Sequence, residues 1–248
     1  MAVIAGNWKM HLTPSATSAY FAAFELPAGS DRHDVIVFPP ALCFAAARAA
    51  VTAAGRIALG VQNVHWEAEG AFTGETSAEA AAAAGAAYAL VGHSERRHVF
   101  GETDAEVARK VGAVRRAGLV PVVCVGETLQ ERKAGQVDAV ILRQLDAALG
   151  GLSDGDGGLM VAYEPVWAIG TGETATPSDA SDAHGTLRER LDHRLGREAS
   201  TGVPVLYGGS VKPGNAAELL AAPVVDGVLV GGASLDPADF AAIVAAAS

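Results

Sequence analysis

Eight short apolar runs, rich in β-branched residues, recur along the chain and restrict its possible folds more than any other feature. None of them alternates between apolar and polar residues, which is typical of strands that are buried on both faces. The runs span residues 3–5, 34–38, 57–61, 88–91, 119–125, 159–163, 203–207 and 227–230. Stretches with helical spacing separate them, so the sequence predicts a strand followed by a helix, repeated eight times.

The stretches between the runs carry the apolar periodicity of helices. Residues 104–117 place three valines on one stripe, and residues 137–149 form a second helical stretch. The 248 residues divide into eight units of about 31, which is the size of one strand–helix repeat with its loops. No linker or break in composition divides the chain, and the glycine-rich residues 150–158 predict only a turn. We therefore expect one domain over residues 1–248.

Polar residues or glycines stand at the carboxyl ends of most runs. In an open doubly wound sheet, functional groups gather at one switch point, whereas a barrel brings the ends of all its strands to one mouth. Because such groups follow most of the runs, we predict an α/β protein with a single-domain (β/α)8 TIM-barrel fold. The groups are Asn7 and Lys9, Gln62 and Asn63, His93 and Glu95, Gly126 and Glu127, Glu164, residues 208–210, and Gly231 and Gly232.

The composition excludes several classes of protein. A chain of 248 residues, half of them hydrophobic, buries roughly three quarters of its unfolded surface, which excludes intrinsic disorder. The 28 acidic and 18 basic side chains give a net charge of −10, whereas nucleic-acid binding requires a surplus of Lys and Arg. We therefore expect no nucleic-acid partner, and an anionic ligand must be attracted by local groups.

The cysteines and the apolar residues also bear on location. Cys43 and Cys124 are the two cysteines of the sequence, and both lie in apolar stretches, which suits a reducing compartment. The first ten residues contain too short an apolar run for a signal peptide, and no window reaches 18 consecutive apolar residues. We expect a soluble, cytoplasmic protein that has no membrane partner.

Glu164 ends the sixth run and is followed at once by Pro165 and a glycine-containing loop. A carboxylate at a barrel mouth is a candidate general base, although an isolated Glu more often faces solvent or pairs with a Lys. The loop favours the first interpretation, because Gly170 and Gly172 leave backbone N–H groups free to approach an anion. Since Trp167 supplies an apolar underside, we predict that this loop is a lid.

Glycine turns follow the seventh and eighth runs, at residues 207–215 and 230–234. Glycine allows bare backbone donors to surround phosphate oxygens, and the late strands of such barrels commonly hold phosphate. Glycine turns alone are often only turns, but the position of these two predicts a phosphate site. Ser210 is not a hydrolase nucleophile, because the second glycine of the nucleophile elbow is missing after it.

His93 follows the fourth run and permits two interpretations. A histidine there is either packed and hydrogen-bonded in the core or catalytic. Metal binding is disfavoured because His93 and His98 are five residues apart, the wrong spacing for neighbouring ligands on a helix face, and no H-E-x-x-H motif occurs. At a barrel mouth, a neutral imidazole would donate a hydrogen bond to a substrate oxygen.

Asn7 and Lys9 end the first run and, being two residues apart, point to the same side of a strand. A lone Lys is usually a solvated surface charge. In a protein of net charge −10 that binds phosphate, however, a cation must lie near the anion, and Lys9 is the cation at the mouth that needs no other explanation. The arginine pair at residues 96–97 is an alternative, but the nearby Glu95 and Glu102 would neutralise it.

Eight segments, in order over nearly the whole chain, carry a family resemblance: residues 5–10 (Ala-Gly-Asn-Trp-Lys-Met), 70–75, 91–97, 100–104, 124–128, 162–172, 207–213 and 226–235. Together they resemble the triosephosphate isomerase family. The resemblance implies interconversion of dihydroxyacetone phosphate and D-glyceraldehyde 3-phosphate, a reaction of glycolysis and gluconeogenesis. It also implies that the reaction needs neither a metal ion nor an organic cofactor.

The resemblance implies roles for the candidate residues as well. Glu164 would move a proton between adjacent carbons, and His93 would polarise the carbonyl group and stabilise the enediolate. Lys9 would supply positive charge, and Asn7 would position groups beside it; both would also bind the substrate. The contacts to the substrate phosphate would come from Gly170, Ser210, Gly231 and Gly232.

Residues 66–77 resemble the long third loop of the family, which inserts into a partner subunit. Thr73 would stand at the tip of this loop, close to Asn7 and Lys9 of the other subunit. Phe72, beside the tip, would be costly to expose to water. The resemblance therefore implies a homodimer formed through the loop around Thr73.

Two other functions are compatible with the same residues. The barrel would then be an isomerase of a longer sugar phosphate, such as a tetrulose phosphate, or a non-catalytic module that binds a metabolite. A base placed beside an electrophile has no use in a binding module, which favours an enzyme. The departures from the family pattern, at His11, Glu173 and Gly214, touch none of the proposed catalytic groups.

Overall fold

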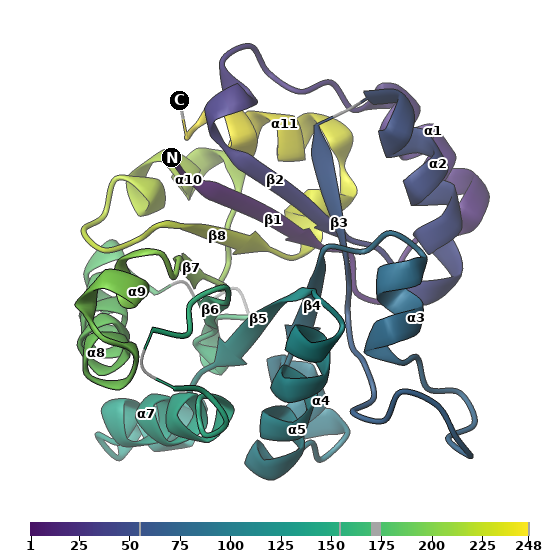
Figure 1. The fold of residues 1–248 in the computed structure, drawn as a ribbon. Helices are drawn as coiled ribbons and strands as arrows, with labels where there is room; N and C mark the ends of the chain where they lie inside the picture. The colour runs from purple at the N-terminus through teal and green to yellow at the C-terminus, as the bar shows by residue number, and fades with distance from the viewer. Residues whose placement is uncertain (55, 154, 170–174, 248) are drawn as a thin grey trace.

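The chain folds into a closed barrel of eight parallel strands, in which each strand pairs with its neighbours in the sequence and the first pairs with the last. The structure is a computed structural model that describes residues 1–54, 56–153, 155–169 and 175–247. Helices surround the barrel (Figure 1). The predicted α/β TIM-barrel fold is confirmed.

The strands agree closely with the predicted runs. Their bounds are β1 Val3–Asn7, β2 Asp34–Phe38, β3 Ile57–Val61, β4 Tyr88–Val91, β5 Val120–Val125, β6 Met160–Tyr163, β7 Val205–Tyr207 and β8 Gly227–Val230. Strands β2, β3, β4 and β8 span the predicted residues, whereas β1 extends to Asn7 and β5, β6 and β7 begin one or two residues later. The unbroken apolar runs are therefore a reliable signal for these strands.

The helices are less regular than one per strand. They are α1 Pro14–Ala23, α2 Phe44–Ala54, α3 Ala78–Ala83, α4 Ser94–Val99, α5 Asp104–Arg116, α6 Leu129–Lys133, α7 Val137–Ala148, α8 Pro177–Leu195, α9 Arg197–Thr201, α10 Pro213–Leu220 and α11 Pro237–Ala245. Short 3-10 helices span Ser30–Arg32, Ala41–Cys43, Val166–Ala168 and Gly232–Leu235. Within the described residues, none of the helices is long and apolar enough to cross a membrane.

Among the residues that the structure describes, two α-helices rather than the predicted one follow each of the strands β4, β5 and β6. A glycine with a left-handed backbone interrupts each pair: Gly101 has φ of 74°, Gly135 of 68° and Gly196 of 78°. A helix does not continue through such a residue. The prediction of one helix per strand is therefore wrong at these three connections.

Helix α5 illustrates how local sequence sets a helix boundary and its buried face. The Thr103 side chain accepts the backbone N–H of Glu106, and the Glu106 carboxylate accepts the backbone N–H of Thr103. This capping box fixes the start of the helix. Val107, Val111 and Val114 are buried, as the predicted stripe requires.

Successive residues of a strand point to opposite faces of the barrel wall. On β1, Val3 and Ala5 pack inside the barrel, whereas Ile4 packs in the layer between the strands and the helices. The inner cluster comprises Val3, Ala5, Ile36, Phe38, Leu90, Val122, Cys124, Met160, Ala162, Leu206 and Leu229. Because side chains fill the interior, a ligand is accommodated at the ends of the strands rather than inside the barrel.

Candidate active site

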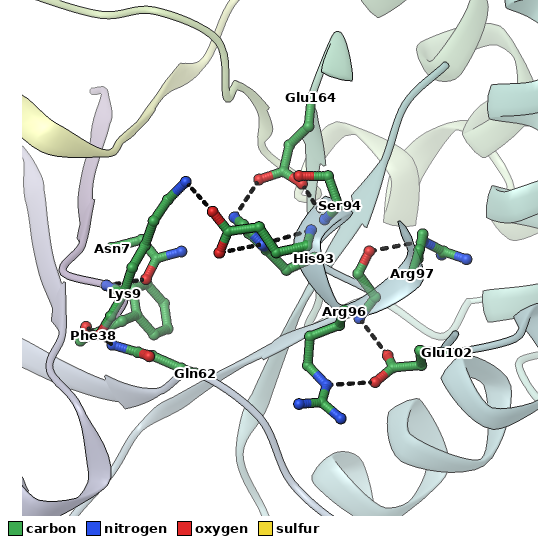
Figure 2. Close-up of polar contacts among 12 residues, drawn as sticks. Asn7, Lys9, Phe38, Gln62, His93, Ser94, Arg96, Arg97, Glu102 and Glu164 are labelled. Carbon is green, nitrogen blue, oxygen red and sulfur yellow. Dashed lines mark hydrogen bonds and ion pairs between the residues drawn. The ribbon is translucent and has the colours of Figure 1, made fainter. Parts of the chain in front are cut away.

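The predicted site residues converge at the carboxyl ends of the strands. Asn7 ends β1, His93 follows β4 and Glu164 follows β6 (Figure 2). Gly170 and Gly172 lie in residues 170–174, outside the residues that the structure describes, whereas Trp167 of the same loop is described and donates its Nε1–H to the Glu127 carboxylate at 2.8 Å. The remaining predicted residues line one cavity of about 580 Å³: Asn7, Lys9, His93, Glu164, Ser210, Gly231 and Gly232.

Glu164 is a buried carboxylate with two hydrogen-bond donors. Its Oε1 atom lies 3.1 Å from Nε2 of His93, and its Oε2 atom accepts the backbone N–H of Ser94 at 2.9 Å. Burial raises the pKa of Glu164, but His93, the Ser94 N–H and the Lys9 ammonium together outweigh burial and lower it. Glu164 is therefore ionised although only 2% of its surface is exposed.

His93 is buried at the start of helix α4. Its Nδ1 atom accepts the backbone N–H of Glu95 at 3.2 Å, which assigns the ring hydrogen to Nε2, facing Glu164. Burial lowers the pKa of His93 and the Glu164 carboxylate raises it, with a net upward change. The described part of the chain contains no group of three His, Cys, Asp or Glu side chains arranged to hold a metal ion.

Lys9 is held at both its backbone and its ammonium group. The backbone has a left-handed φ of 50°, with its N–H bound to Oδ1 of Asn7 at 3.0 Å and its carbonyl bound to Nε2 of Gln62 at 2.8 Å. The ammonium lies 2.6 Å from Oε1 of Glu95. The fold thus gives Lys9 an ion-pair partner, Glu95 of α4, that the sequence analysis did not predict.

The two arginines that follow Glu95 do not line the cavity. Nε of Arg96 lies 2.8 Å from the Glu102 carboxylate, as predicted, and Nη1 of Arg97 lies 2.7 Å from Asp104. Glu95 contacts Lys9 instead of an arginine. Lys9 and Lys212, rather than the two arginines, line this cavity.

The glycine turn after β7 packs directly against the candidate base. A Cβ atom on Gly208 would lie 2.8 Å from Cγ of Glu164, and one on Gly209 would lie 2.0 Å from the Tyr207 hydroxyl. The side chain of Asn215 donates to the carbonyl of Ser210 at 2.9 Å and holds the end of the turn. Glycine is needed at both positions because a side chain would collide with Glu164 or Tyr207.

Sequence reasoning placed Gln62 and Glu95 at strand ends but missed the contacts that they make, and it missed Ser94 altogether. Ser94 contributes only its backbone N–H, Glu95 holds both Lys9 and the His93 ring, and Gln62 holds the Lys9 backbone. The acidic residue in the first turn after His93 is a helix-start signal, which predicts α4 and so the N–H groups near the site. No sequence signal identifies the contact of Gln62 with Lys9.

The family model for triosephosphate isomerase matches residues 2–247 of the chain. The chain belongs to the triosephosphate isomerase family. Relatives named triosephosphate isomerase are similar to it over nearly its whole length. The protein of Solibacter usitatus is 48% identical over 244 residues, which cover 98% of each chain. That of Moorella thermoacetica is 49% identical, covering 98% of this chain and 97% of the relative. That of Afipia carboxidovorans is 52% identical, covering 97% and 95%.

Membership of the triosephosphate isomerase family confirms the predicted family and the predicted isomerase activity. The chain is an enzyme that interconverts triose phosphates. Neither the comparisons nor the cavity favours a four-carbon substrate or a binding module without activity. The same cavity places a buried carboxylate beside an imidazole, the two groups that proton transfer next to a carbonyl requires.

Proposed function

We propose that the cavity of about 580 Å³ is the active site, where dihydroxyacetone phosphate and D-glyceraldehyde 3-phosphate interconvert through an enediolate. One observation carries this proposal: the buried carboxylate of Glu164 faces Nε2 of His93 at 3.1 Å. The reaction needs a base that removes a proton beside a carbonyl and a donor at the oxygen that becomes negative. Glu164 and His93 supply these two groups.

Substrate binding activates the base in this proposal. Both oxygens of Glu164 are engaged, one by the Ser94 N–H and one by His93, so the substrate must replace these contacts. Each of the two contacts lowers the pKa of Glu164, and burial raises it. A carboxylate that turns away from Ser94 toward the substrate is therefore a stronger base. It takes a proton from one carbon and returns it to the adjacent carbon.

His93 acts as a neutral donor in this proposal. The carboxylates of Glu164 and Glu95 are what raise the pKa of its ring, whereas burial and Lys9 lower it. Once a substrate separates Glu164 from the ring, the largest upward influence is weakened. The Glu95 N–H on Nδ1 keeps the hydrogen on Nε2, where it is donated to the oxygen of the enediolate.

Lys9 and Asn7 bind the anionic substrate. The Lys9 side chain passes close to the β8 turn, since a Cβ atom on Gly231 would lie 3.8 Å from its Cε. The ammonium is thus near both the reacting end and the phosphate end of the cavity. The Asn7 carbonyl oxygen is used by the Lys9 N–H, which leaves its amide hydrogens for a substrate oxygen.

The substrate phosphate is held by backbone donors at the turns after β7 and β8. Ser210, Gly231 and Gly232 line the same cavity as the catalytic pair, at the ends of adjacent strands. Glycines expose their N–H groups to an anion without a side chain in the way. We assign a further phosphate contact to Gly170, which lies outside the described residues.

We infer that the active form is a homodimer. Phe72, next to the loop tip at Thr73, is 42% exposed, and Met10 and Phe100 are 94% and 68% exposed. Met10 and Phe100 line a second cavity of about 230 Å³, which also includes Lys9. A partner loop seated there would cover apolar surface that is costly in water. Sedimentation that shows a fully active monomer at micromolar concentration would refute the dimer.

We also propose that residues 1–248 form one domain and that the protein works in the cytoplasm. Strand β1 of the first repeat pairs with strand β8 of the last, so the two ends of the chain belong to the same barrel. Cys43 and Cys124 are both buried, free thiols, which suits a reducing compartment. Limited proteolysis that released a stable fragment would contradict a single domain, and cell fractionation tests the location.

Isotope exchange tests the proposed chemistry directly. Incubation of the protein with dihydroxyacetone phosphate in heavy water should place deuterium on carbon, because the proton held by Glu164 exchanges with solvent before it returns. Mass spectrometry of the recovered triose phosphates measures the label. Conversion of substrate without any carbon-bound deuterium, at short and long times, would contradict proton transfer through a solvent-exchanging base.

A comparison of three-carbon and four-carbon ketose phosphates tests the alternative substrate. The proposal expects a higher kcat/KM for dihydroxyacetone phosphate. A higher kcat/KM for the tetrulose phosphate would assign the longer substrate.

A further inference from the structure

Arg97 of helix α4 uses three of its nitrogens on three different acceptors. Nε donates to the carbonyl of Gly92 at 2.7 Å, Nη2 donates to the carbonyl of Cys124 at 3.2 Å, and Nη1 lies 2.7 Å from Asp104. Its side chain is only 7% exposed. Arg97 lies on the far side of His93 from Lys9 (Figure 2) and does not line the substrate cavity. It therefore has no direct part in binding the substrate.

The two carbonyls that Arg97 holds belong to the strand ends beside the catalytic pair. Gly92 immediately precedes His93 and follows β4. Cys124 lies on β5, which pairs with β4 on one side and, on the other, with β6, the strand that leads to Glu164. One guanidinium thus connects the strand end that carries the electrophile with the strand next to the base.

The peptide before His93 is also held from its other side. The Glu102 carboxylate accepts the N–H of Gly92 at 3.1 Å, while Arg97 donates to the carbonyl of the same residue. Gly92 has a left-handed φ of 72°, so the chain turns sharply there before it presents His93. Because both the N–H and the carbonyl of Gly92 are hydrogen-bonded, the backbone that carries the His93 ring has little freedom to move.

We propose that Arg97 is a positioning residue, which sets the distance and angle between the His93 ring and Glu164 by holding both strand ends. This inference rests on the roles proposed above for His93 and Glu164. The guanidinium is planar, with donors in a fixed fork, whereas a lysine at the same position offers one nitrogen. Lysine therefore keeps the charge but not the three simultaneous contacts.

Arg97→Lys tests the proposal in the intact protein. We expect kcat to fall about 10-fold or more, because small misplacements of a catalytic group cost this much. The KM for dihydroxyacetone phosphate should stay within about twofold, since the phosphate turns and Lys9 are untouched. Nitrogen-15 NMR of the His93 ring should show a changed signal, because the contact of Nε2 with Glu164 is altered.

Arg188→Lys is the matched control. Arg188 also bridges a backbone carbonyl and an aspartate, Ser200 and Asp226, but at the amino-terminal side of β8, far from the catalytic residues. The Arg188→Lys substitution should lower thermal stability without changing kcat or the NMR signal of His93. An equal loss of kcat in the two variants, or a folded Arg97→Lys enzyme with kcat within twofold of wild type, would overturn the proposal.

Asp104→Asn serves if Arg97→Lys does not fold. It removes the ion pairs of Asp104 with Arg97 and with Arg143, and it leaves both carbonyl contacts of Arg97 possible. The same effects on kcat and on the His93 signal are therefore expected, but smaller. An unchanged kcat together with an unchanged His93 signal would overturn the proposal. His93→Gln separates this test from the proposed function: if that variant keeps full activity, the role of His93 itself is wrong.

Discussion

Glu164 fits into its position because the two residues that pack against it, Gly126 and Gly208, are glycines. A Cβ atom on Gly126 would lie 1.8 Å from the carbonyl oxygen of Glu164, and one on Gly208 would lie 2.8 Å from its Cγ. Atoms placed this close must move apart, and protein interiors have little free space to absorb the movement. The carboxylate is thus located by packing as much as by its hydrogen bonds.

Gly208→Ala is expected to lower kcat about 10-fold or more, because the added methyl group pushes the Glu164 side chain from its place beside His93. Steady-state kinetics and a thermal melt measure the effect. Gly214→Ala is the matched control, since a Cβ atom there would meet nothing within 4 Å and should leave kcat unchanged. Similar kinetics for the two variants would show that contact with the base is unimportant.

Glu164→Asp tests the base assignment. Removing one methylene keeps the charge but withdraws the carboxylate by about 1 Å, which costs roughly 100-fold in a proton transfer. We expect kcat to fall by that order and the KM to change only a few-fold, because the phosphate contacts remain. Losses of equal size in kcat and in phosphate binding would argue against Glu164 as the base.

At the scale of elements, helix α8 packs its buried His184 against the strand that leads to Glu164. The His184 ring meets Tyr163 of β6 edge-on, with centroids 6.0 Å apart, and its Nδ1 lies 2.9 Å from the Val224 carbonyl. Burial lowers the pKa of His184 to about 4, although the Val224 carbonyl and Asp226 oppose this change. The packing of α8 on β6 therefore depends on a neutral ring.

This packing predicts a loss of stability in mild acid. The unfolded chain binds a proton at His184 near pH 6.5, whereas the folded chain does so only near pH 4, so stability falls as the pH drops between these values. The free energy of unfolding should be lower at pH 5 than at pH 8 by about 2 kcal/mol because of His184. Urea unfolding of wild type and His184→Gln at both pH values measures it. The variant should show a smaller pH dependence, and an identical one would contradict the shift.

On the scale of the whole molecule, exposed apolar side chains gather near the active site. Phe72 and Thr73 line a cavity that also includes Phe100, and Phe100 in turn lines the cavity that contains Met10 and Lys9. The loop and the second cavity therefore belong to one continuous surface. This arrangement would let a partner loop contact Lys9, which is proposed to bind the substrate.

Thr73→Arg is expected to weaken the proposed dimer and to lower activity at low protein concentration, since a charged side chain at the loop tip opposes burial. Analytical ultracentrifugation and kcat measured over a dilution series provide the readouts. Glu198→Arg, on the exposed face of α9, is the control and should change neither. A Thr73→Arg protein that sediments and turns over like wild type would refute the interface.

The sequence by itself determined the barrel and the main chemistry of this protein. Its apolar runs and the groups that follow them are local signals, so strands such as β2 and β8, and Glu164 at a strand end, can be predicted without the fold. Tertiary structure alone decided that Lys9 pairs with Glu95, 86 residues away, that Gly208 touches Glu164, and how the two helices after β4 are arranged. The physical reason is range: periodicity and capping act over a few residues, whereas these contacts join segments that meet only when the barrel closes.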